Sequence, residues 1–197
     1  MEITASMVKE LREKTGAGMM DCKKFLLEAK GDMEKATTLL REKGLATAQK
    51  RAQKATDEGL VDAYIHTGSK IGVLIQVNCE SDFVARNDDF KTMVRNIAMH
   101  IAAASPLYLQ REDIPQNVLE QEKSIYKNQA INEGKPEKIL DKIVQGRLEK
   151  YYQQACLLEQ PYVKDPDKSV QDYINEHIAI IGENIKVAKF SRFRVGE

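Results

Sequence analysis

The apolar positions in the first 45 residues recur every three or four residues, which predicts three short helices. Gly16, Gly31 and Gly44 mark the expected helix ends, and Asp32 is placed to cap the third helix. The apolar positions are Val8 and Leu11, then Met19, Cys22, Leu26 and Ala29, then Met33, Ala36, Leu39 and Leu40. Because helices this short are stable only when they pack together, residues 1–45 are expected to form a compact three-helix domain.

Residues 46–57 differ in composition, since they are rich in alanine and basic residues and have only a weak apolar face. Alanine, glutamine and lysine have high helix propensity, so this segment is interpreted as a helical or flexible linker. A basic arm that binds phosphate groups is the alternative, although a charge run is more often a solvated surface. A larger domain, residues 58–197, is expected after the linker.

After the linker the apolar pattern changes to a period of two, which is typical of β-strands. Val61, Ala63 and Ile65 alternate with their neighbours, and the alternation resumes over residues 71–79 after the turn 67–70. This arrangement predicts a β-hairpin with one buried face.

Helical periodicity returns in four later segments, and turns are expected at Pro161 and at Asp165-Pro166. Pro136 is expected to be the first residue of the third of these helices. The apolar positions of the four helices span 90–101, 118–130, 139–148 and 170–181, with expected ends near Ser105-Pro106, Gly134 and Gly182.

A last strand is expected over residues 185–195, with Phe190 on the face opposite to the other apolar residues. The residues predicted to share one face are Ile185, Val187, Phe193 and Val195. The pattern as a whole predicts an α+β fold, in which a small, mainly antiparallel sheet is covered by helices.

Composition narrows the class of protein. Hydrophobic residues make up 42% of the chain, and 30 Lys and Arg balance 30 Asp and Glu, so no net charge favours direct nucleic-acid binding. No apolar run approaches the ~20 residues that span a membrane. The N-terminus lacks the pattern of a signal peptide. Three widely spaced cysteines fit a reducing, cytoplasmic compartment better than a disulfide framework.

Motifs for nucleotide, metal and hydrolytic chemistry are missing from the sequence. Gly134-Lys135 lacks the upstream glycine of a phosphate-binding loop, and His66, His100 and His177 lie far apart. The sequence therefore predicts no catalytic residues, no metal site and no cofactor. A cysteine nucleophile with a distant histidine stays open, although Cys22 and Cys79 occupy apolar positions that favour packing.

The stretch 78–87 is unusual because charged residues surround a phenylalanine and a valine where a strand gives way to a helix. In one interpretation, Ser81 or Asp82 caps a helical turn and Phe83 packs into the core. In the other, Phe83 inserts into a pocket of a partner, with Asp82 beside it as a charge.

Two long segments resemble the signatures of the elongation factor Ts family. Residues 79–87 read Cys-Glu-Ser-Asp-Phe-Val-Ala-Arg-Asn, and residues 11–24 read Leu-Arg-Glu-Lys-Thr-Gly-Ala-Gly-Met-Met-Asp-Cys-Lys-Lys. Residues 158–165 and Arg192-Phe193 are also similar to the family, so the resemblance covers essentially the whole chain. Phe25 and Ser81 stand where alanine and threonine are commoner in the family.

The resemblance implies a guanine-nucleotide exchange factor for elongation factor Tu in translation elongation, rather than an enzyme. It further implies an N-terminal domain similar to ubiquitin-associated domains, and a short form without the family's coiled-coil insertion and second core subdomain. Short forms are expected to form homodimers, which gives a 2:2 complex with the GTPase.

The resemblance also implies two sets of site residues. One set displaces Mg²⁺ from the partner GTPase, and the other docks the N-terminal domain on that GTPase. The first set is Ser81, Asp82, Phe83 and Val84, and the second is Leu11, Arg12, Thr15, Gly16, Met19 and Met20.

Two other functions are weighed against this one. An adaptor would bind a ubiquitin-like or helical ligand through residues 16–20. A thiol enzyme would use Cys79 or Cys22, and its reactive thiol would have to be accessible and readily ionised.

Overall fold

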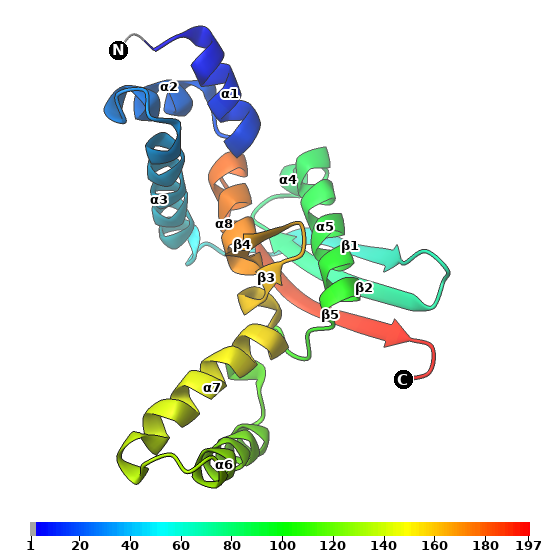
Figure 1. Cartoon of the computed structure of the whole chain (residues 1–197). Coiled ribbons are helices and arrows are strands. Elements are labelled where there is room, and N and C mark those ends of the chain that lie inside the picture. The colour runs from blue at the N-terminus through cyan, green and yellow to red at the C-terminus, as the bar shows by residue number, and fades with distance from the viewer. Residues whose placement is uncertain (1–2) are drawn as a thin grey trace. The chain divides into compact units, whose positions relative to one another are not determined.

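The computed structural model describes residues 3–197 (Figure 1). The chain divides into two compact units. One unit comprises the described residues up to 62, with 76–95 and 172–188, and the other comprises residues 63–75, 96–171 and 189–197. The structure has a three-stranded sheet, a two-stranded sheet and several helices, which confirms the predicted α+β class. The predicted division into 1–45, 46–57 and 58–197 stays a prediction.

The first three helices form as the sequence predicts. They are α1 (Ala5–Thr15), α2 (Met19–Glu28) and α3 (Met33–Arg51). The Thr4 hydroxyl accepts a hydrogen bond from the Met7 amide, and the Asp32 carboxylate accepts one from the Lys35 amide, so both caps are made by side chains. The buried residues of this cluster are Val8, Leu11, Cys22, Phe25, Leu26, Ala29 and Ala36.

The end of α2 differs from the prediction by one residue. Lys30 already has a positive φ of 53°, and Gly31 follows with a φ of 86°. The Gly31 amide donates to the Leu26 carbonyl and the Lys30 amide donates to the Leu27 carbonyl, which is the Schellman arrangement. The left-handed position after the helix is therefore Lys30 rather than Gly31.

The prediction that the third helix ends at Gly44 is wrong. Gly44 is buried within α3, and a Cβ atom there would lie 3.4 Å from the Cβ of Ala179 in α8 (Val170–Ile181). The glycine thus allows a close approach of two helices and does not stop one. Residues 46–51 of the expected linker extend the helix, in agreement with its helical interpretation.

The three-stranded sheet consists of β1 (Glu58–Ile65), β2 (Ile71–Cys79) and β5 (Lys186–Arg194), in the order β1-β2-β5. One face of β2 is buried, as the hairpin prediction required. The chain continues from β2 into the single turn α4 (Asp82–Ala85) and then into α5 (Asp88–Ala104), whose predicted apolar stripe is fully buried. The predicted last helix, α8, also ends at Gly182 as expected.

Two strand faces differ from the prediction. In β1, Val61 and Ile65 are exposed, whereas Leu60 is half-buried, so the inward face is the opposite one. In β5, Val187 is buried but Phe193 is exposed, because the alternation changes phase within the strand. The strand exposes two successive residues, 188 and 189, as a strand does at a β-bulge. Consequently, Ile185 and Val187 do not share a face with Phe193 and Val195.

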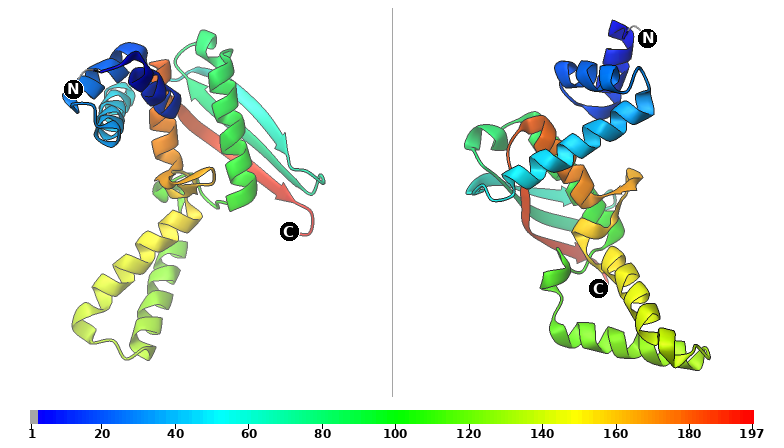
Figure 2. Two further views of the ribbon diagram at one scale, coloured as in Figure 1. Left: turned by 45° about the horizontal axis from the view of Figure 1, so that its top comes forward. Right: turned by 90° about the vertical axis from the view of Figure 1, so that its left-hand side faces the viewer.

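The predicted helices of the middle region are α6 (Gln116–Asn132) and α7 (Leu140–Ala155), which pack as an antiparallel pair (Figure 2). Pro136 precedes a short 3₁₀ turn, η2 (Glu137–Ile139), so the first residue of α7 is Leu140 rather than Pro136. The chain thus carries a helical hairpin, although the resemblance implied a form without a coiled-coil insertion.

Short elements surround this hairpin. They are η1 (Arg111–Asp113), η3 (Leu157–Glu159) and the antiparallel strands β3 (Pro161–Tyr162) and β4 (Asp165–Ser169). The two strands lie where the sequence predicted only turns. The guanidinium of Arg111 pairs with Glu149 and Glu159 and lies 4.2 Å from the ring of Tyr152. These contacts join η1, α7 and η3.

His100 in α5 is fully buried. Its Nδ1 accepts a hydrogen bond of 3.1 Å from the Val163 amide, so a neutral ring places its proton on Nε2, 2.9 Å from the Gln160 side-chain oxygen. Burial lowers the pKa of His100, and the bond to Gln160 opposes this shift. The folded chain therefore holds the neutral imidazole.

We expect the protein to lose stability as the pH falls through the pKa of an unfolded histidine, about 6.5. Below that pH the unfolded chain binds a proton that the folded chain resists, so His100 lowers the free energy of unfolding by at most about 1.4 kcal/mol per pH unit. Urea denaturation at pH 7.5, 6.5 and 5.5 measures this slope. His100→Gln should be less stable at pH 7.5 but should show a shallower slope, and equal slopes would contradict the assignment.

Candidate functional site

The turn between β2 and α5 is built around Ser81. Its backbone is extended, with a φ of −132° and a ψ of 154°, and its hydroxyl accepts a hydrogen bond of 3.3 Å from the Val84 amide. Ser81 is thus the N-cap of α4, as one of the two sequence interpretations proposed. Val84 is buried and anchors the turn, whereas the preceding two side chains point outward.

Phe83 does not pack into the core, because 78% of its surface is exposed. Asp82 forms an ion pair of 2.9 Å with Arg86 one turn later, and both side chains are largely exposed. The structure therefore supports the cap at Ser81 but contradicts the interpretation that buries Phe83. The outward-pointing Phe83 fits the other interpretation, in which it inserts into a pocket of a partner.

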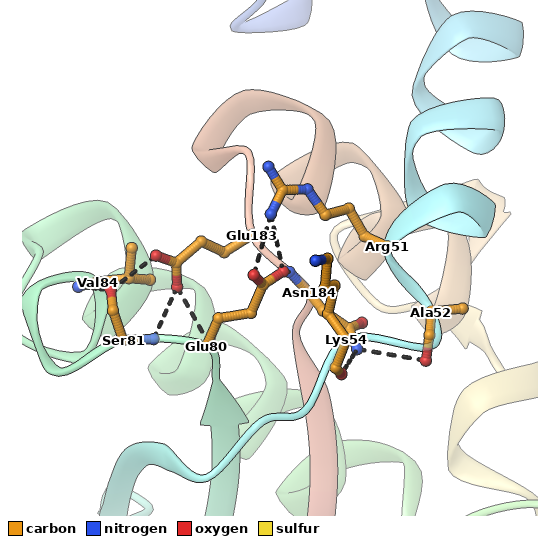
Figure 3. A network of polar contacts seen from close by, with 8 residues as sticks. All are labelled: Arg51, Ala52, Lys54, Glu80, Ser81, Val84, Glu183 and Asn184. Atoms are coloured by element: carbon orange, nitrogen blue, oxygen red, sulfur yellow. Dashed lines mark hydrogen bonds and ion pairs between the residues drawn. The ribbon is translucent and has the colours of Figure 1, made fainter.

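The turn is tied to a residue that the sequence analysis missed. Figure 3 shows the carboxylate of Glu183, just after α8, directed at the backbone before α4. One carboxylate oxygen accepts hydrogen bonds from the amides of Glu80 and Ser81, at 3.1 and 3.0 Å. The other accepts one from the Ser81 hydroxyl at 2.6 Å. These three bonds fix the residues immediately before Asp82.

A second set of contacts holds the same region together (Figure 3). The Glu80 carboxylate accepts two hydrogen bonds from the Arg51 guanidinium at the end of α3, and another of 2.6 Å from the Asn184 amide. The buried Asn184 side chain donates to the carbonyls of Ala52 and Lys54. The end of α3, the turn at Ser81 and the start of β5 are therefore connected by polar contacts.

The second predicted set of residues lies at the junction of α1 and α2. Met20 is 80% exposed and Met19 is 47% exposed, and Arg12 is also exposed. Thr15 is half-buried, and its hydroxyl donates to the Leu11 carbonyl while it accepts from the Ala17 amide. The hydroxyl therefore shapes the loop between the two helices.

Leu11 was expected to contact the partner, but it is fully buried in the core of the three helices. A side chain with no exposed surface cannot touch a partner directly, so this expectation is corrected. Leu11 supports the surface that Arg12 and the two methionines form.

Gly16 is required by its backbone and by its neighbour. Its φ is 68°, and a Cβ atom there would lie 2.9 Å from the Cδ1 atom of Ile180. Any other residue would be strained at this φ and would displace Ile180. Gly16 therefore contributes shape to the surface rather than chemistry.

The three cysteines are buried and unpaired. Burial raises the pKa of Cys79 to about 11, with the charge of Glu183 acting in the same direction. Burial likewise raises the pKa of Cys22, and that of Cys156 to about 11. Such thiols are protonated and poorly nucleophilic at neutral pH, which argues against the thiol-enzyme interpretation.

The remaining chemistry is sparse in the part of the chain that the structure describes. Within residues 3–197, no three His, Cys, Asp or Glu side chains gather as a metal ion would require. No helix in this range is both long and apolar enough to cross a membrane. Two candidate binding features therefore remain. One is the turn at residues 81–85 (the Ser81 turn), with Phe83 exposed, and the other is the surface that Arg12, Met19 and Met20 form at the junction of α1 and α2 (the α1–α2 surface).

Comparison with known proteins establishes the family of the chain. The family model described as "Elongation factor TS" matches residues 2–197. The chain is 63% identical over 195 residues to the elongation factor Ts of Moorella thermoacetica, covering 99% of this chain and 96% of that protein. It is 62% identical over 195 residues to that of Thermoanaerobacter sp. (strain X514), with the same coverage, and 61% identical to that of Acetivibrio thermocellus, covering 99% of this chain and 91% of that protein. The chain therefore belongs to the elongation factor Ts family and is a nucleotide exchange factor of translation elongation, not an enzyme.

Proposed function

We propose that this exchange factor releases GDP from elongation factor Tu by inserting Phe83 into the GTPase, close to the Mg²⁺ and phosphate-loop region. The observation that carries the proposal is the 78% exposure of Phe83 on a turn whose neighbouring residues are held by hydrogen bonds. Burying such a side chain in a partner contributes about 1.5–3 kcal/mol, which is typical of a binding hot spot.

An exchange factor need not bind the nucleotide itself. By linkage, any factor by which it weakens GDP binding equals the factor by which GDP weakens its own binding. Asp82 brings a negative charge next to Phe83, and Mg²⁺ tolerates distorted octahedral coordination poorly. We therefore assign Phe83 the role of wedge and Asp82 that of a charge that disturbs the Mg²⁺ ligands, with Ser81 and Val84 as their frame.

The α1–α2 surface is proposed to dock on the same GTPase. Met19 and Met20 are flexible apolar side chains that adapt to a partner surface, and Arg12 adds a charge beside them. Thr15 and Gly16 shape the loop between the helices, and Leu11 supports it from the core.

A titration of GDP release tests both roles, because the maximal rate reports on the wedge and the half-saturating concentration reports on docking. Fluorescent GDP is bound to purified elongation factor Tu, and its release is followed by stopped flow as this protein is added. We expect acceleration of release by the wild type. Met20→Glu should raise the half-saturating concentration by about tenfold, the cost of one lost apolar contact, and leave the maximal rate nearly unchanged.

A matched control is Leu107→Glu, which places the same charge on a side chain that is 69% exposed in the other unit. It should behave as the wild type. An unchanged half-saturating concentration in Met20→Glu would rule out the docking role, and no acceleration by the wild type would overturn the proposed function.

We further propose that the protein is a homodimer that forms a 2:2 complex with the GTPase. Exposed apolar side chains on the strands and at the end of β5 include Ile65, Leu74, Phe193 and Val195. Gly72 lies beside Ile65, since a Cβ atom on Gly72 would be 3.1 Å from the Ile65 side chain. Apolar surface of this kind on a sheet marks an interface, and a second copy supplies a self-complementary partner.

A further inference from the structure

The orientation of Phe83 cannot be set by α4 alone, because this helix has only four residues. A single helical turn gains too few internal hydrogen bonds to be stable by itself. Of its four side chains only Val84 is buried, and Phe83 is the largely exposed aromatic one. Contacts from outside the turn must therefore hold Phe83 outward.

Glu183 supplies the contacts on the side before Phe83. Two successive amides, those of Glu80 and Ser81, donate to one of its oxygens, which fixes the peptide planes leading into the turn. The Ser81 hydroxyl donates to its other oxygen and itself accepts from the Val84 amide. Because hydrogen bonds to a charged carboxylate are stronger than neutral ones, Glu183 holds the cap as well as the backbone.

The position of Glu183 follows from the end of α8. Gly182 has a φ of 84°, and its amide donates to the Ile178 carbonyl at 2.9 Å. A left-handed glycine after the last helical turn ends the helix and redirects the chain. The next residue, Glu183, is thereby directed to the turn, and Asn184 continues along the same path and donates to Glu80.

We infer that Glu183 is a positioning residue for nucleotide exchange, which keeps the Ser81 turn in the conformation that directs Phe83 outward. This inference rests on the proposed role of Phe83 as the wedge. Glu183 makes no contact with the GTPase in the proposed complex, and it acts through Ser81 and the backbone of Glu80.

The test measures GDP release from elongation factor Tu at increasing concentrations of the full-length variants. Glu183→Ala should lower the maximal release rate by about tenfold or more, since small misplacements of an acting group cost that much. The half-saturating concentration should change by less than about threefold, because the docking surface is intact. Glu183→Gln should recover most of the rate, since its amide oxygen still accepts from the two backbone amides.

A matched control separates positioning from a general loss of stability. Glu133→Ala removes a different hydrogen-bonded carboxylate. Glu133 accepts two hydrogen bonds from the Arg147 guanidinium within the α6–α7 hairpin. This control should keep the wild-type maximal rate. Hydrogen exchange gives a readout independent of the GTPase, because the amides of Glu80 and Ser81 should lose protection in Glu183→Ala and keep it in Glu133→Ala.

The double variant Glu183→Ala with Phe83→Ala, compared with the two single variants, distinguishes this inference from the proposed function. If Phe83 acts through a turn held by Glu183, Glu183→Ala should add little to the slow release by Phe83→Ala. A slow Phe83→Ala together with a Glu183→Ala at the wild-type maximal rate would overturn the positioning role alone. A wild-type rate in Phe83→Ala would overturn the wedge and, with it, the role of Glu183.

Discussion

Phe83→Ala is expected to slow the maximal release of GDP from elongation factor Tu by about 30-fold or more while the protein stays folded. Truncation of a hot-spot aromatic residue costs about 2 kcal/mol or more, which corresponds to about a 30-fold change in an equilibrium or rate constant. The fold should be unaffected because Phe83 is largely exposed and contributes nothing to the described core. Stopped-flow release of a fluorescent GDP measures the rate, and thermal unfolding measures the stability.

Leu107→Ala is a suitable control for this experiment, since Leu107 is similarly exposed and lies outside the Ser81 turn. The control should release GDP at the wild-type rate. A wild-type rate in Phe83→Ala would reject the wedge. A large drop in its unfolding temperature would instead show that Phe83 packs in solution as the rejected sequence interpretation had it.

Local patterns in the sequence predicted most of the helices. The apolar residues of α5 recur at helical spacing, and a glycine with positive φ follows the last residue of α1 and of α8. Gly44 misled the prediction because a glycine inside a helix and a glycine that ends one look alike in sequence. The close approach of Ala179 decides between them, and that residue is more than a hundred positions away.

The faces of the strands were harder to predict, for a similar reason. In β5 a single irregularity moves every later side chain to the other face, so Val187 and Phe193 cannot be placed by counting in twos. In β1 both faces carry apolar residues, and alternation alone does not say which face is covered. Ile65 on the outer face of β1 is one of the side chains that we propose to contact a second copy of the chain.

The site was predictable only where its residues are close in sequence. The strand, the cap at Ser81 and the exposed pair Asp82-Phe83 form one short signature. Glu183 is separated from Ser81 by 102 positions, and it has no periodicity or motif that links it to the turn. The residues of the proposed binding turn are thus read from the local sequence, whereas the residue that holds the turn in place is found only in the folded structure.

The second large effect is expected for a substitution in the proposed dimer interface, and it concerns the oligomeric state. Ile65 and Leu74 are exposed on one face of the sheet, whereas the opposite face of β2 is buried. If two such faces pack on each other, a carboxylate placed at the centre of the contact would be removed from water without a partner, at a cost of several kcal/mol. In a symmetric dimer both chains carry the substitution, so this free-energy cost arises twice and should prevent the apolar faces from associating.

Leu74→Glu is therefore expected to convert the protein from a dimer to a monomer. Light scattering should give twice the chain mass of 22.3 kDa for the wild type and a single chain mass for the variant. Leu107→Glu, with the same charge on a similarly exposed leucine away from the sheet, should remain a dimer. Urea denaturation of the variant shows whether each chain is still folded. A monomeric wild type would overturn the proposed dimer, and Phe83 would then act from a single chain. A dimeric Leu74→Glu would exclude this face of the sheet as the interface.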